Sequence, residues 1–183
     1  YLNTLEVIEK CAQYLESPLV PQRGDKRETF GGRKLQSLPK EERLQKAAAL
    51  APVLRGFCSS QTKMIGHFTD DDRDLEFINS NDLYRLAPLG TSCSDHFLRT
   101  KISPLVLPLT ATEDLSNVAA LKEKLAPEFE AYRKMYADYY NTCKHPNSPA
   151  IRDANPVVIL YPGVGMFTFA KDKQTARVAA EFY

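Results

Sequence analysis

The sequence has no apolar run that approaches the roughly 18–20 residues needed to span a bilayer, and its formal net charge is only +1. The first absence argues against a membrane-spanning helix. The second leaves no electrostatic reason to expect nucleic acid or an anionic membrane as a partner. No apolar secretion signal opens the sequence, so we expect a cytoplasmic protein.

Paired metal ligands and paired cysteines are also absent. The four cysteines contain no CxxC pair, which argues against a zinc ribbon and favours reduced, mostly buried thiols. No two of the three histidines, His67, His96 and His145, lie within twenty-eight residues of each other. Zinc ligands usually include two that are close in sequence. Hydrogen-bonded or surface histidines are therefore favoured over a metal site built from His67, His96 and a carboxylate.

The common cofactor motifs are missing as well. The "GVG" at 163–165 is followed by "MFTFA", another strand, rather than by the helix that a dinucleotide-binding turn requires. The "DDDRD" at 70–74 lacks the alternating ligands and downstream Glu of a calcium loop. No Tyr-x-x-x-Lys pair of the dehydrogenase type occurs, because Tyr132 is followed four residues later by Tyr136.

What is present is the composition of a globular domain, with 43% hydrophobic and 26% charged residues in 183. Apolar residues that recur every three to four positions predict helices, and short apolar or alternating runs predict strands. Helices are expected at the N-terminus, after Ser37 and Pro39, over 81–87, over 113–142 with a kink or two consecutive helices at Pro127, and at the C-terminus. Strands are expected over 63–68, 75–80 and 103–109, and on both sides of Pro162-Gly163. Helices interleaved with strands predict an α/β fold with a single sheet covered by helices.

The densest polar stretch is "GTSCSDHFLRTK" at 90–101. Hydroxyl and cationic groups at the start of a short helix can bind an anion such as a sugar phosphate. The candidate ligand-binding residues are Thr91, Ser92, His96, Arg99 and Lys101. The simpler interpretation, which we favour, is that Ser92 or Ser94 caps this helix and Asp95 complements its dipole.

Three stretches resemble one known family. They are "FGGRKLQSLPKEERLQKAAALAPVLRG", "LAPLGTSCSDHFLRTKISPLVL" and "VVILYPGVGMFTFAKDKQTARVAAEFY". They resemble the middle segment of bifunctional class II aldolase/short-chain dehydrogenase proteins of the rhamnulose-1-phosphate aldolase/alcohol dehydrogenase type. The resemblance spans essentially the whole chain, although Ser94 stands where the family usually has proline before the Asp-His pair.

In such proteins an aldolase/adducin-like domain comes first and a nicotinamide-dependent dehydrogenase domain comes last. The resemblance implies that residues 1–16 match the last helix of the aldolase domain and that 17–34 form a linker. Residues 35–183 would be an intervening aldolase-like domain leading to the dehydrogenase. The complete polypeptide would use NAD and zinc, with neither held by this segment, and would form a homo-oligomer.

Class II aldolase domains typically end with a strand, a His-Gly turn, a second strand and a helix, and the turn histidine binds the metal. Residues 157–183 have that order, with Pro162-Gly163 at the His-Gly place. Since proline has no imidazole, we expect 35–183 to be a degenerate class II aldolase/adducin-like domain without its metal. The main hypothesis is therefore a non-catalytic intervening or scaffold domain, and the alternative is a sugar-phosphate or small-acid binding module.

Overall fold

The computed structural model describes residues 2–16, 29–91 and 93–183, and the side chains of 2, 15 and 16 are outside that description. The α-helices, in chain order, are α1 Leu2–Glu16, α2 Lys40–Cys58, α3 Asp72–Ile78, α4 Leu83–Leu86, α5 Ser94–Thr100, α6 Val118–Cys143 and α7 Lys173–Phe182. Two short 3₁₀ turns, η1 Thr29–Gly31 and η2 Ala87–Leu89, lie between them. None of the described helices combines the length and apolar character that crossing a bilayer requires.

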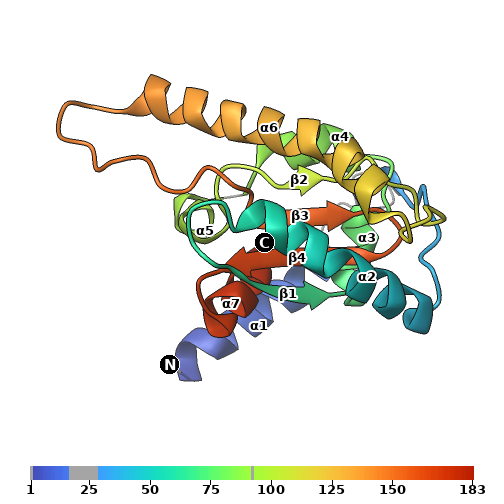
Figure 1. Ribbon diagram of the computed structural model, residues 1–183. Helices are drawn as coiled ribbons and strands as arrows, with labels where there is room; N and C mark the ends of the chain where they lie inside the picture. Colours follow the sequence, from blue (N-terminus) through green and yellow to red (C-terminus); the bar gives the residue numbers. More distant parts are fainter. Residues whose placement is uncertain (1, 17–28, 92) are drawn as a thin grey trace.

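One four-stranded sheet forms the centre of the fold, in the order β1-β4-β3-β2 (Figure 1). The strands are β1 Ile65–Thr69, β2 Leu105–Val106, β3 Val158–Tyr161 and β4 Gly165–Ala170. β4 pairs antiparallel with both β1 and β3, whereas β2 pairs parallel with β3. The strand bracketed by Pro104 and Pro108 lies at the sheet edge, as its prolines predict, because an edge strand needs fewer N–H donors.

Helices cover both faces of this sheet, which confirms the expected α/β class. In β3, Ile159 and Tyr161 join the core cluster under α2 and α6, whereas Val158 and Leu160 join the cluster under α3, α4 and α7. Successive side chains of a strand point to opposite faces, so β3 contributes apolar side chains to the core on each face of the sheet. All four side chains are fully buried.

The segment 75–80, expected as a strand, is instead mostly helix α3, with only Ser80 in an isolated β-bridge to Arg33. Leu75 and Ile78, three residues apart, are both buried on the core-facing side of this helix, and that spacing fits a helical face rather than a strand. The acidic residues just before and within its first turn also suit the positive end of the helix dipole.

The long helix α6 runs through Pro127 without interruption, so the two-helix alternative is wrong. Pro127 is exposed, and so is Glu123, the residue whose carbonyl group loses its helical N–H partner there. The helix starts at Val118 because the Asn117 side chain accepts a hydrogen bond from the Ala120 N–H at 3.1 Å. The expectation of mostly buried thiols is also wrong: only Cys58 is buried, and the other three are exposed.

Part of the expected linker is packed against the domain. Residues 17–28 lie outside the described part, but 29–34 lie alongside 79–82: Lys34 N–H donates to the Asn79 carbonyl at 2.7 Å, and Asn81 N–H donates to the Gly32 carbonyl at 2.9 Å. In contrast, the side chains of 3–14 in α1 are all exposed. These hydrogen bonds therefore attach residues 29–34 to the segment 79–82.

Candidate functional site

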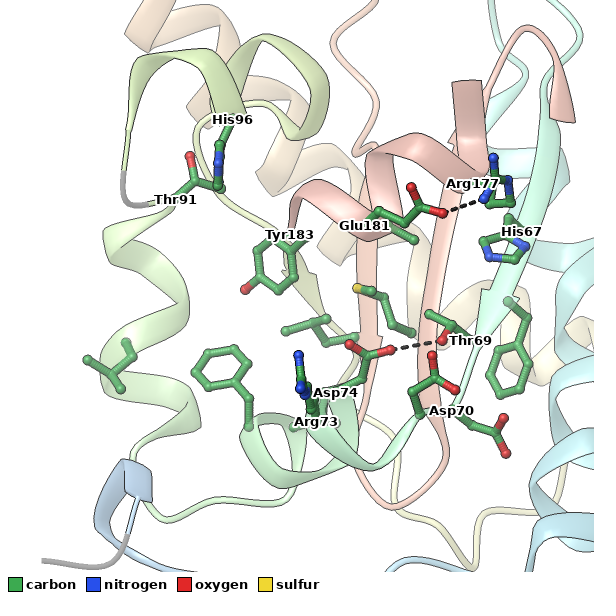
Figure 2. Close-up of a pocket in the computed structure, with 18 of the residues that line it drawn as sticks. His67, Thr69, Asp70, Arg73, Asp74, Thr91, His96, Arg177, Glu181 and Tyr183 are labelled. Atoms are coloured by element: carbon green, nitrogen blue, oxygen red, sulfur yellow. Dashed lines mark hydrogen bonds and ion pairs between the residues drawn. The ribbon is translucent and has the colours of Figure 1, made fainter. Parts of the chain in front are cut away.

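Two large clefts flank α5 and α7, and residues of both helices line both clefts. We call the first the acidic groove. It has a volume of about 980 Å³, and its charged lining residues are Asp70, Asp71, Arg73, Asp74, Arg177 and Glu181 (Figure 2). Its floor is apolar and includes Ile78, Leu160 and Met166. A cleft of this size with a few polar groups over an apolar floor suits a small ligand.

Asp74 is the carboxyl group of the acidic groove whose pKa is shifted upwards. Burial raises its pKa, the Thr69 hydroxyl that donates to Oδ2 at 2.9 Å opposes that shift, and the nearby charges of Asp71 and Asp70 add to it. Asp70 itself is paired with Arg43, Nη2 to Oδ2 at 2.8 Å, and both side chains are largely buried. The Arg43–Asp70 pair therefore links α2 to the residue that follows β1.

Replacing Asp74 with Asn is expected to raise the melting temperature at neutral pH. Since the folded-state pKa lies above the usual 3.8, the unfolded chain loses this proton first, and stability falls as pH rises through that interval. Asn keeps an acceptor for Thr69 and has no charge. The gain should be present at pH 7 and vanish below about pH 4, as measured by thermal melts from pH 3 to 8.

The exposed Asp72 supplies the control, because it lies in the same helical turn. Asp72→Asn removes a charge of the same sign from the helix start, where an anion is favourable, and should lower the melting temperature slightly at pH 7. An Asp74→Asn gain that persists unchanged at pH 3 would contradict the assignment of the effect to ionisation.

The histidines of the acidic groove lie on different elements. His67, on β1, has its Nδ1 3.0 Å from Lys173 Nζ; burial, followed by the charges of Lys173 and Arg177, lowers its pKa. His96, on α5, packs edge-to-face on Phe182 with ring centroids 5.3 Å apart. Figure 2 shows the two histidines on opposite sides of the groove, with Glu181 and Tyr183 between them. This arrangement does not bring the two imidazoles to one point.

The second cleft, which we call the basic groove, has a volume of about 1080 Å³. Its basic lining residues are Arg99, Lys101, Lys144, Arg152 and Lys171. Lys101 is half-enclosed in it: Nζ donates to the carbonyl groups of Asp153 and Asn155 and lies 4.4 Å from the Tyr136 ring centroid. Burial lowers the pKa of Lys101 to about 8, partly offset by Asp153.

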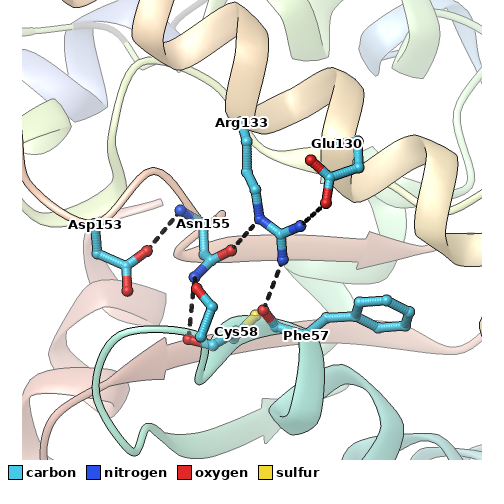
Figure 3. Close-up of polar contacts among 7 residues, drawn as sticks. Phe57, Cys58, Glu130, Arg133, Asp153 and Asn155 are labelled. Atoms are coloured by element: carbon cyan, nitrogen blue, oxygen red, sulfur yellow. Dashed lines mark hydrogen bonds and ion pairs between the residues drawn. The ribbon is translucent and has the colours of Figure 1, made fainter.

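Asn155 anchors the loop 144–156 that forms one wall of the basic groove (Figure 3). Its Oδ1 accepts from Arg133 Nε at 2.7 Å, and its Nδ2 donates to Ser60 Oγ at 2.7 Å. Arg133 also donates to the Phe57 carbonyl at 3.0 Å and pairs with Glu130. These bonds join α6, the end of α2 and the loop, so the wall is fixed before any ligand arrives.

The five residues singled out in 90–101 are divided between the clefts. Thr91 and His96 line the acidic groove, Arg99 and Lys101 line the basic groove, and Ser92 lies outside the described residues. The helix cap favoured above is not formed by Ser94, which is the first residue of α5. Cys93 occupies the N-cap position and its side chain makes no capping hydrogen bond. Sequence reasoning missed Arg152 and Lys171, which come from a loop and a strand end with no periodicity to mark them.

The turn at Pro162-Gly163 is closed by packing. Both residues are buried; the Gly163 N–H donates to Asn79 Oδ1 at 2.7 Å, and its carbonyl accepts from the Leu38 N–H at 3.0 Å. A Cβ at Gly163, where φ is +82°, would lie 2.6 Å from the Ala111 Cβ. These residues do not fit a zinc ion, since proline and glycine side chains offer no ligand and the space is filled.

Elsewhere in the described ranges, no three His, Cys, Asp or Glu side chains lie close enough together to ligate a metal ion. The 163–165 glycines do not fit a nicotinamide dinucleotide either, because the turn joins two antiparallel strands rather than a strand and a helix. The residues present therefore fit neither group that the family resemblance implies for the complete polypeptide.

Comparison with known proteins decides the family. The family model described as "Aldolase class II, second domain" matches residues 45–183. The chain belongs to this family. The matched region thus runs from within α2 through α7 and includes the closed turn, the basic groove and all of the acidic groove except Phe30. The resemblance noted above is confirmed at the level of the class II aldolase family.

A relative from Bacillus subtilis (strain 168), named "Uncharacterized oxidoreductase YuxG", is 33% identical over 184 residues. The match covers 100% of this second-domain chain and 25% of YuxG, so the chain spans about a quarter of the length of that relative. No solved structure matches the chain. The second domain therefore has a counterpart within a much longer protein named as an oxidoreductase.

Proposed function

We propose that this second domain is a non-catalytic intervening domain of a cytoplasmic, bifunctional polypeptide of the rhamnulose-1-phosphate aldolase/alcohol dehydrogenase type. It positions flanking domains of the same polypeptide and contributes to a homo-oligomer. Those flanking domains perform retro-aldol cleavage of a ketose phosphate with zinc and NAD-dependent oxidation of an alcohol or aldehyde. The support is the family match together with a relative four times as long that is named an oxidoreductase.

The observation that carries the non-catalytic role is the closed turn. At the place where the resemblance puts a metal-binding histidine, Pro162 and Gly163 are buried and bonded to Asn79 and Leu38. A catalytic metal site needs an open coordination position as well as ligands. Here the backbone groups of the turn are used for packing, which is a structural role.

The expected result of removing the titratable groups of the acidic groove is little change in activity. In the complete polypeptide, the variants His67→Ala, His96→Ala and Asp74→Asn should each leave kcat for aldol cleavage and for NAD-dependent oxidation within about twofold, because these groups take no part in either reaction. Loss of a general acid or base would instead lower kcat by about 10²–10⁴-fold. Kinetic assays of both activities and metal content per chain measure this. A loss of about 100-fold in a folded variant would show that the domain is catalytic.

The positioning role also makes a direct prediction. Lysine cross-linking with mass spectrometry on the complete polypeptide should join exposed lysines of this domain, such as Lys40 and Lys122, to domains on both sides. Cross-links confined to the domain itself would contradict a scaffold.

The second candidate is a binding module for a sugar phosphate or small acid. Arg99 and Lys101 in one cleft are the observation that favours it, whereas Thr91 and His96 belong to the other. A ligand at 100 times its Kd would stabilise the fold by about 2.7 kcal/mol. Absence of any thermal shift with a panel of phosphorylated sugars would exclude this function and leave the scaffold role untouched.

A further inference from the structure

The two clefts have opposite charge, although the chain as a whole is nearly neutral. The acidic groove is lined by four carboxylates and two guanidinium groups. The basic groove is lined by five cationic side chains and two carboxylates, Asp153 and Asp172. Like charges gathered around one concave surface repel each other and raise the local concentration of anions. Of the two clefts, the basic groove is therefore the one in which binding of an anion is electrostatically favourable.

Three of the five cations are available to a ligand. Lys101 is used by two loop carbonyls, and Lys144 by Asn141 Oδ1 at 3.0 Å. Within the described residues, no ion pair or hydrogen bond occupies the side chains of Arg99, Arg152 and Lys171. These three come from α5, the loop before β3 and the end of β4, so they surround the cleft instead of lying along one surface helix.

Each of the two carboxylates of the groove accepts at least one hydrogen bond from the protein itself. Asp172 caps α7: one oxygen accepts from the Thr175 N–H and the other from the Thr175 hydroxyl, both at 2.8 Å. Asp153 Oδ1 accepts from the Asn155 N–H at 2.7 Å. Asp153 Oδ2 is buried and has no hydrogen-bond partner among the described residues. Neither carboxylate forms an ion pair with the three available cations.

The remaining lining favours a hydroxylated ligand over a planar base. Tyr136 and Tyr140 each have a lysine ammonium near a ring face, at 4.4 Å and 5.7 Å from the centroid. A nucleobase would have to compete with these cations for the rings. Gln61, Thr62 and Ser148 offer amide and hydroxyl groups in the same cleft, which suit sugar hydroxyls.

We propose that the basic groove binds a small phosphorylated polyol or sugar, with Arg99, Arg152 and Lys171 around the phosphate group. Guanidinium groups pair with phosphate oxygens bidentately, and Lys acts as a point charge beside them. The loop anchored by Asn155 holds the backbone near Arg152 in the wall before binding, which lowers the cost of ordering the loop, whereas the exposed Arg152 side chain is ordered by the ligand. This inference rests on the second function proposed above and gives it a location and a ligand class.

Hydrogen–deuterium exchange of the complete polypeptide tests the location, because peptides of this domain are read separately from those of other domains. Inorganic phosphate and glucose 6-phosphate should slow exchange in 97–101, 144–156 and 170–175, whereas glucose should not. The double variant Arg152→Gln/Lys171→Gln should raise the Kd for glucose 6-phosphate at these peptides at least about tenfold, since two charged contacts are lost.

Arg73→Gln is the matched control, because it removes one cation from the acidic groove and should leave the Kd unchanged. Protection that appears around the acidic groove, or that survives Arg152→Gln/Lys171→Gln, would overturn the basic-groove site while leaving the binding function standing. No protection anywhere in the domain by either phosphate compound would overturn both, and equal protection by glucose would overturn the phosphate assignment.

Discussion

Replacing Gly90 with alanine should destabilise the domain by about 3 kcal/mol or more, because two costs add at this position. Gly90 has φ +77° and ψ −152°, a region that only glycine enters readily. A Cβ there would lie 1.9 Å from the backbone carbonyl oxygen of Ile102, which no side-chain rotation can relieve. Thermal and urea unfolding should show the melting temperature lowered by roughly 6–12 °C.

Gly56 is the matched control for this substitution. It lies in α2 with nothing within 4 Å of an added Cβ, so Gly56→Ala should stabilise the domain by about 0.5–1 kcal/mol through helix propensity. Gly90 also lines the acidic groove beside Thr91. A Gly90→Ala variant as stable as the unmodified protein would mean that the chain does not pass against Ile102 as the structure has it.

The second large effect is expected from Asn155→Ala, at about 2–4 kcal/mol. Asn155 is 4% exposed, and truncation leaves Arg133 Nε and Ser60 without their amide partners. The Arg133 guanidinium, whose side chain is 24% exposed, loses an acceptor at the position of a buried amide, where water replaces the bond only in part. Chemical denaturation measures the loss, and the same variant should weaken phosphate protection in the basic groove by freeing the loop.

A double-mutant cycle separates this network from general damage. Arg133→Ala and Asn155→Ala should couple by about 1–3 kcal/mol, since each removes the other's partner. The control is the exposed Asn141, whose side-chain oxygen accepts a hydrogen bond from Lys144, three residues later. Asn141→Ala should change stability by less than about 0.5 kcal/mol. Additive effects of Arg133→Ala and Asn155→Ala would argue against the bond seen in Figure 3.

Local signals explain which parts of the fold were predictable. The prediction of strand, turn, strand and helix for the closing segment is confirmed, because continuous apolar residues, Pro162-Gly163 and the helical periodicity each act within a few positions. Helix α3 was assigned wrongly in part because Leu75, Phe77 and Ile78 fit both periods. Packing of Leu75 and Ile78 against the rest of the domain decided between them.

The candidate site was less predictable than the fold. The density of polar groups in 90–101 predicts one ligand-binding site there. In the structure, α5 places His96 in one cleft and the residues after it in the other. Arg152 joins Arg99 only because the 144–156 loop returns across the end of α6, where Lys101 and Arg133 hold it. These two contacts join residues 52 and 22 positions apart, and no sequence period records them.

By itself the sequence determined the α/β class, the edge position of the proline-bracketed strand, the membership of the class II aldolase family and the absence of a ligand at Pro162-Gly163. The fold class, the edge position and the lack of a ligand follow from side-chain chemistry and short-range periodicity, which each residue carries wherever the chain goes, whereas the family follows from the match over residues 45–183. Only the tertiary structure decided that the turn is filled by Asn79, Leu38 and Ala111, and that acidic and basic residues are sorted into two separate clefts. Those outcomes depend on long-range packing, where the path of the backbone rather than the identity of any one residue sets which groups meet.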